Sequence, residues 1–237
     1  GILIYTWAEE VIVRGDYAFP ISKEYPTDVT SILGCAVATG FGAVVNTAQV
    51  RPGSSVAVFG VGGVGLSAIN TASIIDAFPI IAVDLQDKKL DFAKEFGADY
   101  TILVNNNSES IEQVKKITKD QGADYVVEVT GDPNVINPGI EMLGVGGKYI
   151  LLGAIYPGSD FTVDSSKIIR NAIKIIGLHN YSPKYLKDAM NLVKQSKNKY
   201  PFKKIVGPNF DFSVQGVENA FKSLDSKKSL RPSIIPS

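Results

Sequence analysis

The chain has 237 residues, of which 45% are hydrophobic, and it carries 24 basic and 24 acidic side chains. This length and composition are sufficient for a large buried core, and the zero formal net charge gives no basic surplus for nucleic acid or for an anionic membrane surface. No apolar run approaches the roughly 18 residues that a membrane helix needs, and the N-terminal sequence GILIYTWAEE has neither the basic leader nor the long apolar core of a signal peptide.

Apolar runs and helical patterns alternate through the middle of the chain. Before them, we expect a strand at residues 9–13 and a helix at residues 28–48. Runs rich in β-branched residues predict buried strands, at residues 55–60, 80–84, 100–104, 123–131, 147–153 and 172–178. Helical spacing of apolar residues predicts helices between them, at residues 64–75, 86–97, 108–120 and 134–144. After residue 180 we expect further elements, namely helices at 184–195 and 214–224, a short strand near Ile205 and an extended segment at 230–237.

Strands that alternate with helices are joined by right-handed crossovers and form a parallel, doubly wound sheet. We therefore predict an α/β fold, a six-stranded Rossmann sheet with a partial second domain on its flanks. The sheet domain is expected at residues 39–180. Residues 1–38 and 181–237 do not extend the alternation, and they are expected to be the parts of the second domain.

The segment VAVFGVGGVGLSAI, residues 56–69, has four glycines in six positions. Gly60, Gly62 and Gly65 match the pattern G-x-G-x-x-G between a predicted strand and a predicted helix, which is the context that the pattern requires. Gly60 permits a tight turn, Gly62 lets a pyrophosphate approach the main chain, and Gly65 lets the helix pack closely on the sheet. The N–H groups at the start of that helix would then face the phosphates. A glycine-rich turn without a ligand is the alternative.

An acidic residue ends the next predicted strand. Asp84 follows Gly65 by nineteen residues, and a carboxylate there can accept hydrogen bonds from both hydroxyls of an adenosine ribose while repelling a 2′-phosphate. No arginine follows in DLQDKK, residues 84–89, so NAD is favoured over NADP. Asp84 can also be a turn residue that caps the helix beginning near Gln86, and the two roles are compatible.

Several motifs resemble the zinc-containing, medium-chain alcohol dehydrogenases, in the same order along nearly the whole chain. They are GCAVATGFGAVVNTAQVRPGSSVAVFGVGGVGLSAI, IIAVDLQDKKLDFAKEFGADYTI, GADYVVEVTG, GGKYILLG and KKSLRPSI. The resemblance implies an NAD-dependent oxidoreductase that transfers a hydride between an alcohol or carbonyl substrate and NAD with the help of zinc. It also implies that this chain lacks most of the family's N-terminal, GroES-like catalytic domain.

The resemblance implies ten cofactor-binding residues, which are Gly60, Gly62, Gly63, Val64, Gly65, Asp84, Lys89, Val129, Thr130 and Arg231. Val64 would lie against the nicotinamide, and Lys89 beside the adenosine ribose. Val129 and Thr130 would flank the adenine-side ribose and the bridge of the cofactor, and Arg231 would lie near its phosphates. A solvated surface charge is the alternative for Lys89 and for Arg231.

The resemblance also assigns the catalytic positions. Thr39 matches a residue against the nicotinamide ring, and Cys35 matches a ligand of the catalytic zinc. Such a zinc has three protein ligands and an open position, where it lowers the pKa of the alcohol before the hydride moves to the nicotinamide. Without the resemblance, a lone cysteine in an apolar stretch is usually a small buried hydrophobic residue. A single cysteine also excludes an internal disulfide, which favours the cytoplasm.

The sequence departs from the family in its metal ligands. It has one cysteine and one histidine, His179, and Glu9, Glu10 and Glu128 form no ligand pattern with Cys35. Three explanations stay open. The chain is a fragment of a longer enzyme, a natural short NAD-binding module without catalysis, or a zinc-free enzyme like the quinone reductases.

The expected partners are a small alcohol or carbonyl substrate and a second copy of the chain, with no nucleic acid and no membrane. The resemblance implies a homodimer in which the strand at 172–178 pairs with its twin across a two-fold axis. Without the missing segment, four apolar side chains near the N-terminus are expected to be exposed and to favour pairing or aggregation. They are Ile2, Leu3, Ile4 and Trp7.

Overall fold

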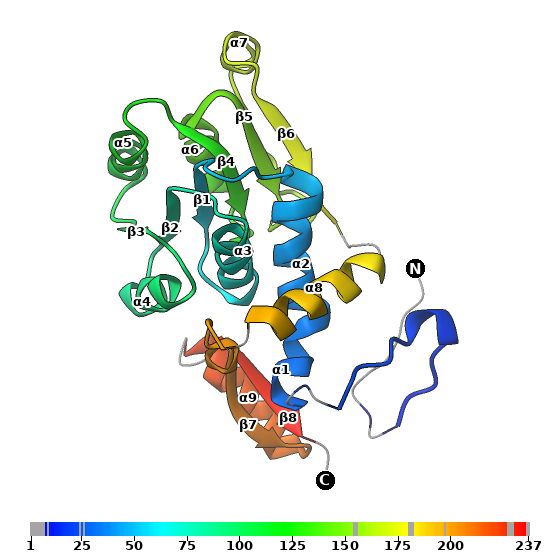
Figure 1. Ribbon diagram of the computed structural model, residues 1–237. Coiled ribbons are helices and arrows are strands. Elements are labelled where there is room, and N and C mark those ends of the chain that lie inside the picture. The colour runs from blue at the N-terminus through cyan, green and yellow to red at the C-terminus, as the bar shows by residue number, and fades with distance from the viewer. Residues whose placement is uncertain are drawn as a thin grey trace. The chain divides into compact units, whose positions relative to one another are not determined.

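The computed structural model describes residues 8, 10–23, 25, 27–153, 156–179, 183–196, 198–226 and 230–235. The chain divides into two compact units, one formed by Ile32–Ile205 and one formed by Gly1–Ser31 together with Val206–Ser237 (Figure 1). The expected boundaries lay at 38 and 180, so this division groups residues 32–38 and 181–205 with the sheet.

The larger unit is built on a parallel sheet. Its described strands are β1 (Val56–Phe59), β2 (Ile80–Asp84), β3 (Tyr100–Leu103), β4 (Ala123–Glu128), β5 (Leu143–Leu151) and β6 (Lys174–Gly177). Their order is β3-β2-β1-β4-β5-β6, and every neighbouring pair is parallel. The strand order reverses between β1 and β4, which is where a doubly wound sheet opens a crevice at its carboxyl edge. The predicted fold class is confirmed.

Most helices of this unit lie between consecutive strands, and the final helix follows the last strand. They are α3 (Gly63–Ile74), α4 (Asp87–Glu95), α5 (Asn107–Ile117), α6 (Ile136–Glu141), α7 (Ser165–Arg170) and α8 (Pro183–Ser196). The 3-10 turn η4 (Pro133–Val135) precedes α6 and η5 (Phe202–Lys204) follows α8. The helix expected at 134–144 is shorter than predicted because β5 begins at Leu143, and α7 had no predicted counterpart.

Both faces of the sheet are covered. Alternate residues of a strand point to opposite faces, and every residue of β1 and β2 is buried. One face packs Ala57 and Phe59 of β1 with Val114 of α5 and Ile140 of α6. Burial on both faces explains why the strands are continuous apolar runs rather than alternating ones.

The helix expected at 28–48 forms as four successive segments, α1 (Thr27–Ile32), the π-helix η2 (Leu33–Val37), α2 (Ala38–Phe41) and the π-helix η3 (Gly42–Ala48). By length and composition alone, Val29–Ala48 is long and apolar enough to cross a membrane, which corrects the expectation that no such run exists. However, 56% of its most apolar window is buried inside the protein. A Cβ on Gly40 would lie 2.7 Å from Ser67 Cβ of α3, so α2 packs as a core helix.

The smaller unit contains a second sheet. There β7 (Val206–Asp211) runs parallel to β8 (Arg231–Ile235), and α9 (Val214–Asp225) connects them. The short 3-10 turn η1 (Gly15–Tyr17) lies in the N-terminal part. The prediction of a strand at 9–13 is wrong for the described residues 11–13, which pair with no described strand. The side chains of residues 11–13 are exposed, and Ile12 is fully exposed. The apolar run that led to the strand prediction is therefore not covered by a described sheet. Ile2, Leu3, Ile4 and Trp7 lie outside the described residues.

Candidate functional site

The glycine turn between β1 and α3 lies at the carboxyl edge of the sheet. Gly60 has a φ of +91°, and a Cβ there would lie 2.9 Å from Thr130 Cγ2. A Cβ on Gly65 would lie 1.9 Å from the carbonyl oxygen of Gly60. The turn therefore excludes side chains at both positions, one because of its backbone conformation and one because α3 approaches so closely.

Gly62 differs from both neighbours in the motif. It is the N-cap of α3, with φ −89°, and apart from its neighbours in the chain no heavy atom of the described residues lies within 4 Å of the position of an added Cβ. Packing therefore does not require a glycine at position 62. Because Gly62 has no side chain, the space beside its main chain is open. The first N–H groups of α3 face away from the helix without intrahelical partners, so the open space adjoins donors suited to a phosphate.

Asp84 ends β2 and is only 9% exposed. Its Oδ2 accepts a hydrogen bond of 2.7 Å from the N–H of Val61, inside the glycine turn, and its Oδ1 accepts one of 3.0 Å from the N–H of Gln86. Lys89 Nζ lies 4.0 Å from Oδ2. The carboxylate thus ties the glycine turn to the start of α4, and each oxygen keeps a lone pair for a further donor.

The contact between Asp84 and Val61 could not be derived from sequence, because it depends on the register of β1 against β2, in which Phe59 pairs with Val83. The alternative of Asp84 as a turn residue at the start of α4 is part of the geometry, since the N–H of Gln86, the N-cap of α4, donates to it. Lys89 lies within ion-pair distance of the same carboxylate.

The segment after β4 closes the glycine turn from the other side. Val129 Cγ2 lies 3.3 Å from the Cβ position of Gly60 and 3.4 Å from that of Gly65. Thr130 contacts the Gly60 position with its Cγ2. Val129 and Thr130 therefore pack against the glycine turn, and their contact with a cofactor stays a prediction.

Glu128, the last residue of β4, is a site residue that sequence reasoning missed. It is fully buried and accepts hydrogen bonds from the N–H of Thr130 (2.6 Å), the hydroxyl of Thr130 (2.6 Å), the N–H of Gly131 (2.9 Å) and the N–H of Gly153 (3.2 Å). An acidic residue inside a predicted buried strand was the available signal, because a buried carboxylate needs several donors.

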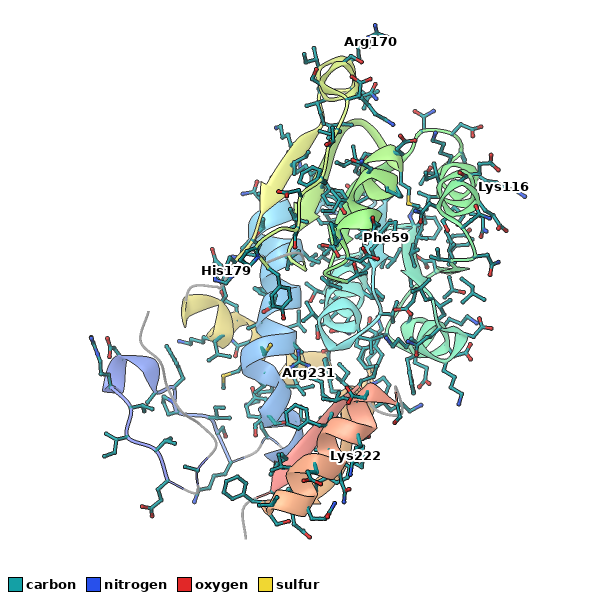
Figure 2. All side chains as sticks on the ribbon, turned by 180° about the vertical axis from the view of Figure 1, so that it is seen from behind. Phe59, Lys116, Arg170, His179, Lys222 and Arg231 are labelled. Carbon is teal, nitrogen blue, oxygen red and sulfur yellow. The ribbon has the colours of Figure 1, made fainter. Side chains whose placement is uncertain are left out.

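Cys35 and Thr39 lie on the helical segments that pack beside α3. Cys35, in η2, is exposed and Thr39, in α2, is half-buried. His179 follows β6 at the edge of the sheet (Figure 2). In the described part of the chain, no three His, Cys, Asp or Glu side chains gather in a group that could hold a metal ion. The residues described therefore do not fit a zinc centre by themselves.

Arg231 begins β8 in the smaller unit, where it pairs with Val206. Its predicted place near the cofactor phosphates stays a prediction.

Comparison with known proteins agrees with this geometry. A family model described as zinc-binding dehydrogenase matches residues 63–195. Alcohol dehydrogenase 1 of Trifolium repens is 31% identical over 222 residues, 89% of this chain and 58% of the relative. The "CYP enzymes assisting alcohol dehydrogenase" of Catharanthus roseus is 39% identical over 153 residues, 63% of this chain and 41% of the relative.

The solved structure of benzyl alcohol dehydrogenase from Acinetobacter calcoaceticus superposes with a TM-score of 0.86 at 30% identity, covering 94% of this chain and 61% of that one. The chain thus spans roughly half of the length of the curated relatives named above. The family model, which covers more than half of the chain and includes the glycine turn from Gly63 onward, decides the assignment. The chain belongs to the zinc-binding dehydrogenase family.

Proposed function

We propose that the chain binds NAD along the carboxyl edge of its sheet and contributes this cofactor site to an oxidoreductase of the alcohol dehydrogenase type. The observation that carries the proposal is the open space at Gly62, the N-cap of α3. The preceding residue, Val61, is held by Asp84 through a hydrogen bond of 2.7 Å. The names of the relatives support the reaction class.

The residues present suit the two ends of the adenosine diphosphate part of NAD. The main chain at Gly62 and Gly63 would hold the pyrophosphate, because no side chain intervenes. Asp84 would accept hydrogen bonds from the ribose hydroxyls and repel a 2′-phosphate, with Lys89 beside it. Bound NAD supplies a nicotinamide that accepts or donates a hydride.

The remaining cofactor contacts follow from the sheet order. Val129 and Thr130 follow β4, on the far side of β1 from Asp84, so they would contact the middle of the dinucleotide. We also propose that Val64 and Thr39 face the nicotinamide.

The substrate is proposed as a small alcohol or carbonyl compound, and the metal as zinc with Cys35 as one ligand. The described residues do not complete a metal site, so the zinc proposal requires ligands outside them. Because this set of metal ligands is incomplete, we consider a second candidate function, in which reduced NAD donates its hydride without a metal, as in the quinone reductases. An NAD-binding module without turnover is the third.

A homodimer and a cytoplasmic location complete the proposal. β6 is an edge strand of the described sheet, and Ile175 within it is 36% exposed. An unpaired edge of this kind can pair with a second copy.

Titration with NADH, followed by nicotinamide fluorescence, tests the cofactor site. Assays of alcohols and quinones with and without added zinc then separate the three activities. Saturable NADH binding with turnover of an alcohol only when zinc is present would support the first. Turnover of a quinone without zinc would support the second, and binding without turnover the third.

A further inference from the structure

The carboxylate of Glu128 lies at the point where two strand ends meet. Its Oε1 accepts three hydrogen bonds from residues directly after β4, and its Oε2 accepts one of 3.2 Å from the N–H of Gly153, two residues after β5. All four groups are donors, which an ionised carboxylate can accept together because it has about four lone-pair positions. Glu128 therefore links the segments that follow β4 and β5.

These two segments are packed so closely that only glycines fit between them. A Cβ on Gly153 would lie 2.2 Å from the backbone nitrogen of Gly131, and a Cβ on Gly131 would lie 3.0 Å from the carbonyl oxygen of Gly153. Gly131 also has a φ of +82°, a conformation that favours glycine. The relative position of the two turns is therefore fixed by backbone contact and by the buried carboxylate beneath it.

The link continues to the glycine turn after β1. The side chain of Thr130, whose hydroxyl donates to Glu128 (2.6 Å), lies 2.9 Å from the Cβ position of Gly60 through its Cγ2. Moving the end of β4 would therefore move the wall of the glycine turn. One buried carboxylate thus connects the carboxyl edges of β1, β4 and β5.

The sheet order determines which part of the cofactor this affects. A doubly wound sheet binds a dinucleotide across its switch point, one nucleotide over each half. Asp84 marks the β1-β2-β3 half as the adenosine side, so the second nucleotide lies over β4, β5 and β6. We propose that Glu128 is a positioning residue for the nicotinamide half of NAD, acting by holding the ends of β4 and β5 in register. This inference rests on the proposed NAD site.

The test compares ligands that occupy one half or both halves of the site. Glu128→Gln keeps the shape but turns one acceptor oxygen into a donor, so at least one N–H or O–H group loses its partner. Glu112→Gln, on the exposed surface of α5, is the matched control. For wild type and both variants, dissociation constants for NADH and for AMP are measured by calorimetry, and folding is checked by thermal unfolding.

We expect Glu128→Gln to weaken NADH binding by about tenfold, the size of one lost hydrogen bond to a charged group, while AMP binding changes by less than about twofold, within the usual scatter of distant sites. The control should match wild type for both ligands. Equal loss of affinity for NADH and AMP would mean that Glu128 has a purely structural role, and it would overturn the inference. Unchanged affinity for both ligands would overturn it as well.

Two further outcomes are distinguishable. Wild-type protein that does not bind NADH contradicts the proposed function, and this inference with it, whatever the variants do. If Glu128→Gln does not fold, Glu128→Asp replaces it, because the shorter side chain keeps the charge but withdraws the carboxylate from the N–H of Gly153, which donates to it at 3.2 Å. Its NADH affinity should then fall more than its AMP affinity, and an equal fall would contradict the inference.

Discussion

At the scale of single residues, Asp84 joins two properties that are usually considered separately. It is the residue that we propose binds the ribose of the cofactor, and it holds the glycine turn by accepting a hydrogen bond from the N–H of Val61. An asparagine would keep an oxygen for one of the two N–H donors but would lose the negative charge and one acceptor.

We therefore predict that Asp84→Asn weakens NADH binding by about tenfold, the effect of one charged hydrogen bond, and narrows the preference for NADH over NADPH. Calorimetric titration with both cofactors measures this. Asp87→Asn, exposed in the first turn of α4, is the control and should keep the wild-type preference. An unchanged NADH to NADPH ratio in Asp84→Asn would argue against the ribose role.

Tyr149 places a polar hydroxyl group in the hydrophobic core, which lowers the stability of the fold. Its side chain is fully buried, its hydroxyl has no hydrogen-bond partner among the described residues, and its ring fills the space where Gly139 of α6 has no side chain. Burial, and to a lesser degree the charge of Glu128, raises the pKa of Tyr149 above its ordinary value of 10.0.

The raised pKa means that the folded state holds the tyrosine proton more tightly than the unfolded state. The stability that comes from this tighter proton binding by Tyr149 is fully present below about pH 10. Above about pH 10 the free energy of unfolding decreases by about 1.4 kcal/mol per pH unit. Tyr149→Phe removes the unpartnered hydroxyl, so its free energy of unfolding should exceed that of wild type by about 1 kcal/mol at neutral pH. The difference should widen above pH 10. Urea unfolding of both proteins across pH measures this, and parallel curves would refute it.

At the scale of elements, two substitutions in the turn between β1 and α3 can distinguish an effect on protein stability from an effect on NADH binding. Gly62 and Gly65 belong to one motif, but a methyl group meets open space at the first and the oxygen of Gly60 at the second. The same substitution should therefore have different effects at the two positions.

Gly62→Ala should unfold at nearly the wild-type temperature and bind NADH at least about tenfold more weakly, because its methyl group occupies the space proposed for the pyrophosphate. Gly65→Ala should lose about 2–4 kcal/mol of stability through overpacking at the backbone. Thermal unfolding and NADH fluorescence measure the two effects. A Gly62→Ala protein with wild-type affinity would contradict the proposed position of the phosphates.

Much of this element structure could be predicted from sequence. The central strands β1 and β2 are apolar runs because both of their faces are buried. The helix α5 begins at a polar cap, Asn106, whose side chain accepts a hydrogen bond from the N–H of Glu109. The glycine motif and Asp84 were predicted from their places at the ends of predicted strands, whereas Val129 and Thr130 were implied by the family resemblance alone.

The rest depends on contacts that are remote in the sequence. The role of Glu128 requires the ends of β4 and β5 to meet, 25 residues apart. The strand expected at 9–13 failed because an apolar run forms a strand only where another strand pairs with it. The π-helical turns around Cys35 and the short helix α7 likewise leave no periodic pattern that distinguishes them.

At the scale of the whole molecule, the described sheet has two edges, β3 and β6. The proposed homodimer uses β6, whose Ile175 is partly exposed. Ile175→Lys should place charges face to face at a two-fold interface and shift the protein from dimer to monomer. Tyr100→Lys, on the opposite edge strand β3, is the control. Light scattering at micromolar concentration measures both, and wild-type protein of monomeric mass would contradict the dimer.

The account depends most on the binding of NAD at the carboxyl edge of the sheet. Isothermal titration of the wild-type chain with NADH tests it directly. The account predicts saturable heat with one cofactor bound per chain and much weaker heat with NADPH. No heat with either the reduced or the oxidised form of NAD would contradict it.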